Sequence, residues 1–104
     1  MDIAKDVYAI NEILPEKEKY ALISQLWRAS ISIPSNIAEG SAKSSDKDYK
    51  RFLEIALGSS FEIETQLIII DKIYLEMKSE VKELLIKVDE EEKMIIAFIK
   101  TLSS

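Results

Sequence analysis

The residues best suited to chemistry gather in the run SIPSNIAEG, residues 32–40. At spacings of three, one and three, its polar residues fall on one strip of a helix: Ser32, Ser35, Asn36 and Glu39. Hydroxyl, amide and carboxylate groups can bond the backbone, pair with a cation or contact a ligand. The strip predicts either a structural contact between helices or a ligand site, and we expect the structural contact.

Two residue types that carry much of protein chemistry are missing, because the chain has no histidine and no cysteine. Their absence excludes disulfides, thiolate and imidazole metal ligands, thiol nucleophiles and the commonest base at neutral pH. Di-metal carboxylate bundles need Glu-x-x-His elements. Glu62 and Glu64 lie two apart on a predicted helix, so their side chains point in different directions. The sequence therefore predicts a protein that is not an enzyme and has no metal or other cofactor.

The overall charge is acidic, with 14 basic and 19 acidic residues and a net charge of −5. This balance argues against a surface that grips nucleic acid everywhere, although a local patch can differ in sign. One predicted loop is locally basic, because its cations outnumber Asp46 and Asp48. Its cations form a candidate nucleic-acid contact, named here the basic loop patch: Lys43, Lys47, Lys50 and Arg51.

Helix-breaking residues are few, since the chain has two glycines and two prolines. Apolar residues at helical spacing predict a first helix over residues 2–14, ended by Pro15. A second helix is expected over residues 16–39, with a bend at Pro34. Gly40 then fits the left-handed position that commonly follows a helix end.

A third helix is predicted to begin at Ser45, whose side chain can cap it in a Ser-x-x-Asp arrangement with Asp48. Its apolar pattern changes register between Tyr74 and Lys78, so a fourth helix is expected beyond that point. The acidic run DEEEK at residues 89–93 of the fourth helix is interpreted as a solvated stretch.

The second and third helices should form a hairpin with a turn near Lys43, in which paired positions sum to roughly 86 to 90. This register places Glu39 near Arg51 and Arg28 near Glu62. Such ion pairs are expected to fix the register of the helices rather than to bind a ligand. The residues of these pairs and of the first strip together form the polar strip: Arg28, Ser32, Ser35, Asn36, Glu39, Arg51 and Glu62.

Four consecutive aliphatic residues cover most of the circumference of the third helix, at about 100° per residue. A monomeric bundle should keep one face of this helix polar, so we expect another subunit to cover part of the surface, with a crowded core as the alternative. The candidate oligomer interface is Leu67, Ile68, Ile69 and Ile70.

Small residues around Gly58 are expected to admit a neighbouring helix that carries Trp27, with space for a ligand as the alternative.

These helices predict an all-α, up-and-down antiparallel four-helix bundle in a single domain, residues 1–104. The beginning of the chain, MDIAKD, lacks the features of a signal peptide, and the longest aliphatic run is too short to span a membrane. We therefore expect a cytoplasmic protein that has no membrane partner.

The stretch from Gln25 to Leu67 also has a recognisable order of motifs. It reads QLWRASISIPSNIAEGSAKSSDKDYKRFLEIALGSSFEIETQL, with an arginine, SIPSNIAEG, an aromatic residue, RFL, ALGS and E-x-E-T-Q-L in sequence. This order resembles the four-helix bundle proteins that are also called 23S ribosomal RNA intervening-sequence proteins. Their relatives include the accessory variability determinants of diversity-generating retroelements. The resemblance extends more weakly to both ends of the chain.

The resemblance implies an up-and-down bundle that assembles as a ring-like homo-oligomer, with a pentamer as the expected form. It also implies nucleic-acid binding through a strongly basic surface in the retroelement relatives, which contact a reverse transcriptase as well. This chain departs from that basic pattern through its net charge of −5. Two functions are therefore expected. One is a non-enzymatic oligomeric scaffold or adaptor with a protein partner, and the alternative is an accessory protein that contacts RNA through the basic loop patch.

Overall fold

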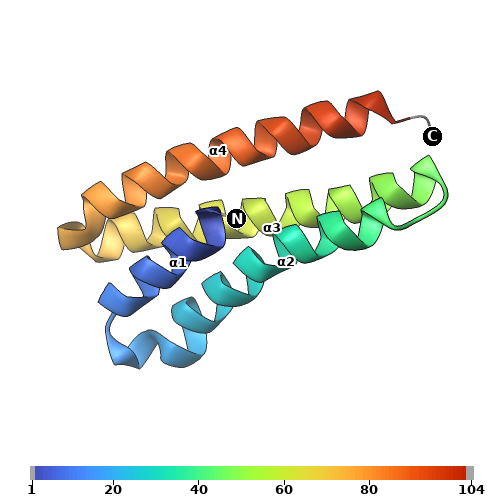
Figure 1. Ribbon diagram of the computed structural model, residues 1–104. Helices are drawn as coiled ribbons and strands as arrows, with labels where there is room; N and C mark the ends of the chain where they lie inside the picture. The colour runs from blue at the N-terminus through green and yellow to red at the C-terminus, as the bar shows by residue number, and fades with distance from the viewer. Residues whose placement is uncertain (1, 103–104) are drawn as a thin grey trace.

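The computed structural model describes residues 2–102, which contain four α-helices and no strand (Figure 1). The helices are α1 (Asp2–Ile13), α2 (Ser24–Ser41), α3 (Asp46–Ile73) and α4 (Lys78–Thr101). Short helices join them: a 3-10 turn (Glu16–Glu18) and a π-helix (Lys19–Ile23) precede α2, and a 3-10 turn (Leu75–Met77) precedes α4. The prediction of an all-α protein is confirmed.

The end of α1 follows from the proline that comes next. The ring of Pro15 disfavours helical geometry in the residue before it. The last helical bond runs from the Leu14 amide to the Ile10 carbonyl, at 3.1 Å, and the chain then turns. The helix therefore ends within one residue of the predicted position.

The segment before α2 differs from the prediction of one helix over residues 16–39. The π-helix Lys19–Ile23 inserts extra backbone at this point, and the Asn11 amide donates a hydrogen bond to the Ile23 carbonyl at 3.2 Å. A π-helix departs from the α-helical repeat, so side chains within it do not continue the apolar rows of α2. Tyr20, placed by the sequence pattern on an apolar row, is 87% exposed.

Gly40 has a different role from the one predicted. α2 continues through Pro34 to Ser41, and no glycine in the described residues has a positive φ. A Cβ atom on Gly40 would lie 2.8 Å from Cδ1 of Tyr49 and 2.9 Å from Cβ of Phe52. Glycine is therefore required here because α3 approaches the backbone of α2 closely.

Both predicted boundaries of α3 are confirmed. The Ser45 side chain accepts a hydrogen bond from the Asp48 amide at 3.2 Å, which caps the first turn. At the other end, the Tyr74 amide bonds the Ile70 carbonyl at 2.8 Å before the chain enters the 3-10 turn. The Tyr74 hydroxyl donates a hydrogen bond to the carboxylate of Glu18, which ties together the two connections at this end of the molecule.

Each helix contributes apolar side chains to one elongated core, in a molecule that measures 45 × 23 × 18 Å. α3 packs against α2 and α4, while the shorter α1 packs against α2 and α4 over only part of their length (Figure 1). None of the helices in residues 2–102 has the length and apolar character needed to cross a bilayer.

Candidate functional site

A partly buried polar contact joins α2 to α3 at the centre of the predicted polar strip. The Ser59 hydroxyl of α3 donates to the Ser32 hydroxyl of α2 at 2.8 Å. The Asn36 amide donates to the Ser32 carbonyl at 2.8 Å and to its hydroxyl at 2.9 Å. These bonds satisfy polar groups inside the helix contact and fix the register of the two helices. The sequence placed Ser32 and Asn36 correctly but gave no such role to Ser59.

Arg28 and Glu62 form the ion pair that was predicted, with 2.8 Å between Nη2 and Oε2. The same guanidinium donates to Oε1 of Gln25 at 3.0 Å. The Arg28 and Glu62 side chains remain 56% and 45% exposed. Solvent screens such a pair, so it contributes geometry more than stability.

The predicted pairing of Glu39 with Arg51 is wrong. Glu39 pairs with Lys43, four residues later in the turn after α2, at 3.3 Å, and the Arg51 guanidinium lies over the Phe52 ring at 4.7 Å. Because Phe52 faces Gly40, Arg51 is rotated away from α2 by about 100°. Ser35 is exposed and takes no part in the hydrogen bonds that join the helices.

The basic loop patch lies at the turn between α2 and α3. Lys43 is placed over the Phe52 ring, at 5.2 Å, beside Arg51. Lys47 and Lys50 belong to the first turns of α3, where Asp46 and Asp48 also lie. The four cations are thus brought to one end of the molecule, but two carboxylates share that end.

The four residues predicted to form an oligomer interface divide between the core and the surface of the subunit. Leu67 and Ile70 are buried in the core of their own subunit, whereas Ile68 and Ile69 are 41% and 42% exposed. The helix repeat explains the division, because positions three apart share the core-facing side of α3.

The exposed pair extends into a larger apolar surface that the sequence prediction missed. Phe61 is exposed on the same side of α3, next to a hollow of about 320 Å³ that Gly58 and Thr65 also line. A Cβ atom on Gly58 would meet nothing within 4 Å, so the expected close contact of Gly58 with Trp27 is wrong. The exposed small and apolar residues form the α3 outer face: Gly58, Phe61, Thr65, Ile68 and Ile69.

Trp27 lies elsewhere, in an aromatic pair between α1 and α2. Its ring meets that of Tyr8 edge to face, with 5.8 Å between the centroids. The pair borders a groove of about 380 Å³, to which Asn11 and Ile23 also contribute. The Asn11 side-chain oxygen is enclosed and has no hydrogen-bond partner. Because this atom is not exposed to the groove, it gives no sign of a ligand there.

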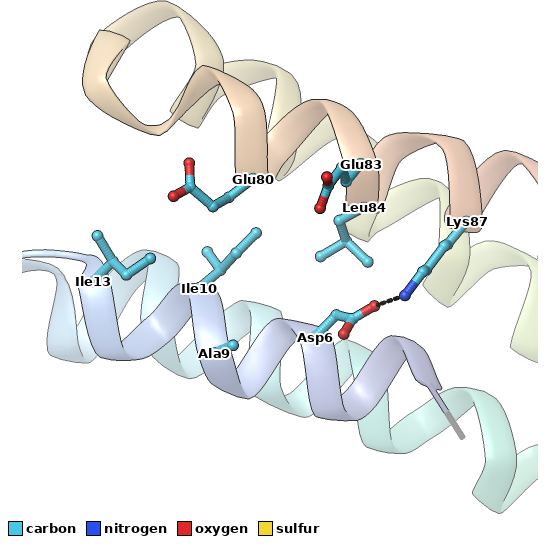
Figure 2. Close-up of a pocket in the computed structure, with 8 residues that line it drawn as sticks. All are labelled: Asp6, Ala9, Ile10, Ile13, Glu80, Glu83, Leu84 and Lys87. Atoms are coloured by element: carbon cyan, nitrogen blue, oxygen red, sulfur yellow. Dashed lines mark hydrogen bonds and ion pairs between the residues drawn. The ribbon is translucent and has the colours of Figure 1, made fainter.

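A second groove separates α1 from α4 (Figure 2). Ile10 and Leu84 line its apolar side, Glu80 lies on the α4 rim, and the pair between Lys87 and Asp6 closes one end at 2.5 Å. Its volume is about 130 Å³, enough for a small alkyl group beside the carboxylates. Among residues 2–102, no group of three or more acidic side chains is arranged to hold a metal ion.

Glu92 corrects the interpretation of residues 89–93 as a solvated stretch. Its side chain is enclosed between α3 and α4, and the residue is only 6% exposed. Burial raises the pKa of Glu92 from 4.5 to about 7, and a hydrogen bond with Glu64 and the charges of Glu64 and Asp89 act in the same direction. The spacing from Val88 was a usable signal, because a position four residues after a core residue also faces inward.

The comparisons with known proteins bear on this helical architecture. No curated protein matches the chain. The family model described as 23S rRNA-intervening sequence protein matches residues 1–97. Since this match spans nearly the whole sequence and the structure has the four helices expected of the family, the chain belongs to the 23S rRNA-intervening sequence protein family.

Proposed function

We propose that the chain is a non-enzymatic subunit of a homo-oligomer, in which an up-and-down bundle presents the α3 outer face to a second copy. The family resemblance implies a ring, and a pentamer is the expected form. The assembly would act as a scaffold or adaptor for a protein partner. The observation that carries the proposal is an exposed glycine in the middle of the longest helix, beside exposed aromatic and aliphatic side chains.

Gly58 lowers the stability of α3, so its presence calls for a contact from outside the subunit. A glycine within a helix destabilises it by about 1 kcal/mol relative to alanine. Inside the subunit, a Cβ atom at this position would meet no neighbour within 4 Å. Close approach of another chain is a simple reason to keep the position without a side chain.

The spacing of the α3 outer face also favours a helical partner. Gly58, Phe61, Thr65 and Ile68 follow one another at intervals of three, four and three. This is the repeat of a helix that packs along another helix at a shallow angle. The stripe lies on the side of α3 opposite the core residues Ile63 and Leu67. A second helix could therefore pack there without disturbing the subunit.

The assembly is tested by sedimentation velocity and native mass spectrometry at tens of micromolar protein. Wild type should be an oligomer, and Ile68→Glu should raise its dissociation constant at least about tenfold, because a charge would be buried against apolar surface. Ile86→Glu is the matched control, since Ile86 is an exposed isoleucine on α4. A monomeric wild type, or equal effects of the two variants, would overturn the proposal.

Nucleic-acid contact through the basic loop patch is the second candidate. It is supported by the two cations over Phe52 and by the absence of a carboxylate partner for Arg51 among the described residues. In a ring, copies of the patch would repeat along one rim and their fields would add.

This second function is tested by titrating ribosomal RNA fragments at low and moderate salt. Replacing Lys47 and Lys50 by Glu should weaken binding, while Lys82→Glu, an exposed change on α4, should have a smaller effect. Phosphate contacts release counterions, so affinity should fall steeply as salt rises. No detectable binding at low salt would eliminate this function.

A further inference from the structure

Two glutamates meet across the contact between α3 and α4, the helices that lie side by side in Figure 1. Glu92 comes from the core-facing side of α4, between the buried residues Val88 and Ile95. Glu64 comes from α3, next to the buried Ile63, and is itself half-buried. The Glu92 carboxyl group is thus buried at the contact between the helices, and the half-buried Glu64 faces it.

No cation neutralises this pair in the described part of the chain. The lysines of α4 that form ion pairs are engaged with other carboxylates: Lys78 with Asp71, Lys87 with Asp6, and Lys93 with Asp89. The Oε2 atom of Glu92 is enclosed and accepts no hydrogen bond from any donor. A buried, unpaired carboxylate is unfavourable, and two facing carboxylates are more so.

A single shared proton would remove both difficulties. A protonated carboxyl group is a hydrogen-bond donor as well as an acceptor, and an ionised one next to it is a strong acceptor. We propose that Glu64 and Glu92 share one proton across the contact between α3 and α4, which makes the packing of these helices sensitive to pH near neutrality. The proton resides chiefly on the more enclosed Glu92 and is donated to Glu64.

The negative charges around the pair also favour the protonated form of Glu92. From α3 the facing group is Glu64, and on α4 the nearby charge is Asp89, one turn before Glu92. α1 and α2, which pack on the other side of the core, have their ion-pairing charges directed elsewhere: Asp6 to Lys87, Arg28 to Glu62, and Glu39 to Lys43. Loss of the proton therefore leaves two negative charges facing each other, and the contact loosens.

The consequence for stability has a definite sign. In the unfolded chain Glu92 has its ordinary pKa of 4.5, and in the folded protein the pKa is raised to about 7. Between these values the folded state holds the extra proton, so stability falls as the pH rises. The stabilising effect of the proton is fully present below about pH 4.5 and is lost above about pH 7.

Urea unfolding at a fixed protein concentration, from pH 5 to pH 8, tests the proposal. The unfolding equilibrium constant of wild type should rise by up to about tenfold per pH unit between pH 5 and 7, relative to Glu92→Gln. The amide of that variant donates a hydrogen bond to Glu64 without a titratable proton. Glu64→Gln should flatten the profile similarly. Glu90→Gln, an exposed change two residues before Glu92 in the same acidic run, should follow wild type.

A carbon-13 titration of the glutamate side-chain carboxyls in the wild-type protein provides a readout that does not depend on a variant folding. The Glu92 carboxyl should titrate near pH 7. Titration of the Glu92 carboxyl near pH 4.5, or parallel unfolding profiles for wild type and Glu92→Gln, would overturn the shared proton. Sedimentation at each pH separates subunit unfolding from changes in assembly, so this test remains distinct from that of the proposed oligomer.

Discussion

At the scale of single residues, the two glycines of this chain occupy opposite environments. Gly40 is buried against α3, where a Cβ atom would lie less than 3 Å from two aromatic side chains, while Gly58 faces open space. Both lie inside helices, so both forgo the helix-favouring effect of a side chain. The same substitution should therefore change the stability of the subunit in opposite directions.

Gly40→Ala should lower the free energy of unfolding by about 1–3 kcal/mol, because overpacking outweighs the gain in helix propensity. Gly58→Ala should raise the free energy of unfolding of the isolated subunit by up to about 1 kcal/mol, because no clash opposes the gain in helix propensity. Urea unfolding of the two variants against wild type measures both changes, at a concentration where the subunits are dissociated. Destabilisation by Gly58→Ala under these conditions would contradict the open environment of that glycine.

Part of the polar contact between α2 and α3 was predictable from residue types and their spacing. Ser32, Asn36 and the pair of Arg28 with Glu62 follow from helical spacing and the register of a hairpin, and the structure places them as expected. Glu39 does not pair with Arg51, because Phe52 faces Gly40 and the helical rotation of about 100° per residue then points Arg51 away from α2. Sequence spacing cannot predict such a rotation, since it depends on how near the two backbones come.

At the scale of helices, the start of α3 depends on its cap. Ser45→Ala removes the acceptor of the Asp48 amide and should lower the free energy of unfolding by about 0.5–2 kcal/mol. Ser44→Ala is a matched control, because Ser44 is exposed and precedes the cap. Circular dichroism during thermal unfolding should show a lower midpoint for Ser45→Ala only. Equal midpoints for the two variants would contradict the cap.

Helix positions were predictable where a proline, a cap or a change of apolar register marked them. Pro15, Ser45 and the segment from Tyr74 to Lys78 are examples, and the structure follows them closely. The π-helix Lys19–Ile23 was not predictable, because it depends on contacts with α1, including the bond from Asn11. Glu92 was missed for a related reason, since a charged run usually lies in solvent and only packing encloses one member of it.

At the scale of the whole molecule, the proposed assembly can be tested through the glycine that the subunit itself does not need. Gly58→Leu adds a large side chain to the α3 outer face and should raise the dissociation constant of the oligomer by about tenfold or more, because a partner helix could no longer approach closely. The folded subunit should persist, as judged by its helical circular dichroism. An unchanged sedimentation profile over a range of concentrations would argue against this face as the interface.

The close contact at Gly40 also has a consequence for the order in which the chain folds. α2 and α3 share the most extensive helix contact and are joined by a turn of few residues, so closing this hairpin restricts the chain little. The opposite end closes only when Tyr74 meets Glu18, and those residues are far apart in sequence. We therefore expect the transition state to contain the Gly40 end of the hairpin already formed, with α1 and α4 docking afterwards. Substitutions at Gly40 would then slow folding, whereas substitutions at Tyr74 would mainly speed unfolding.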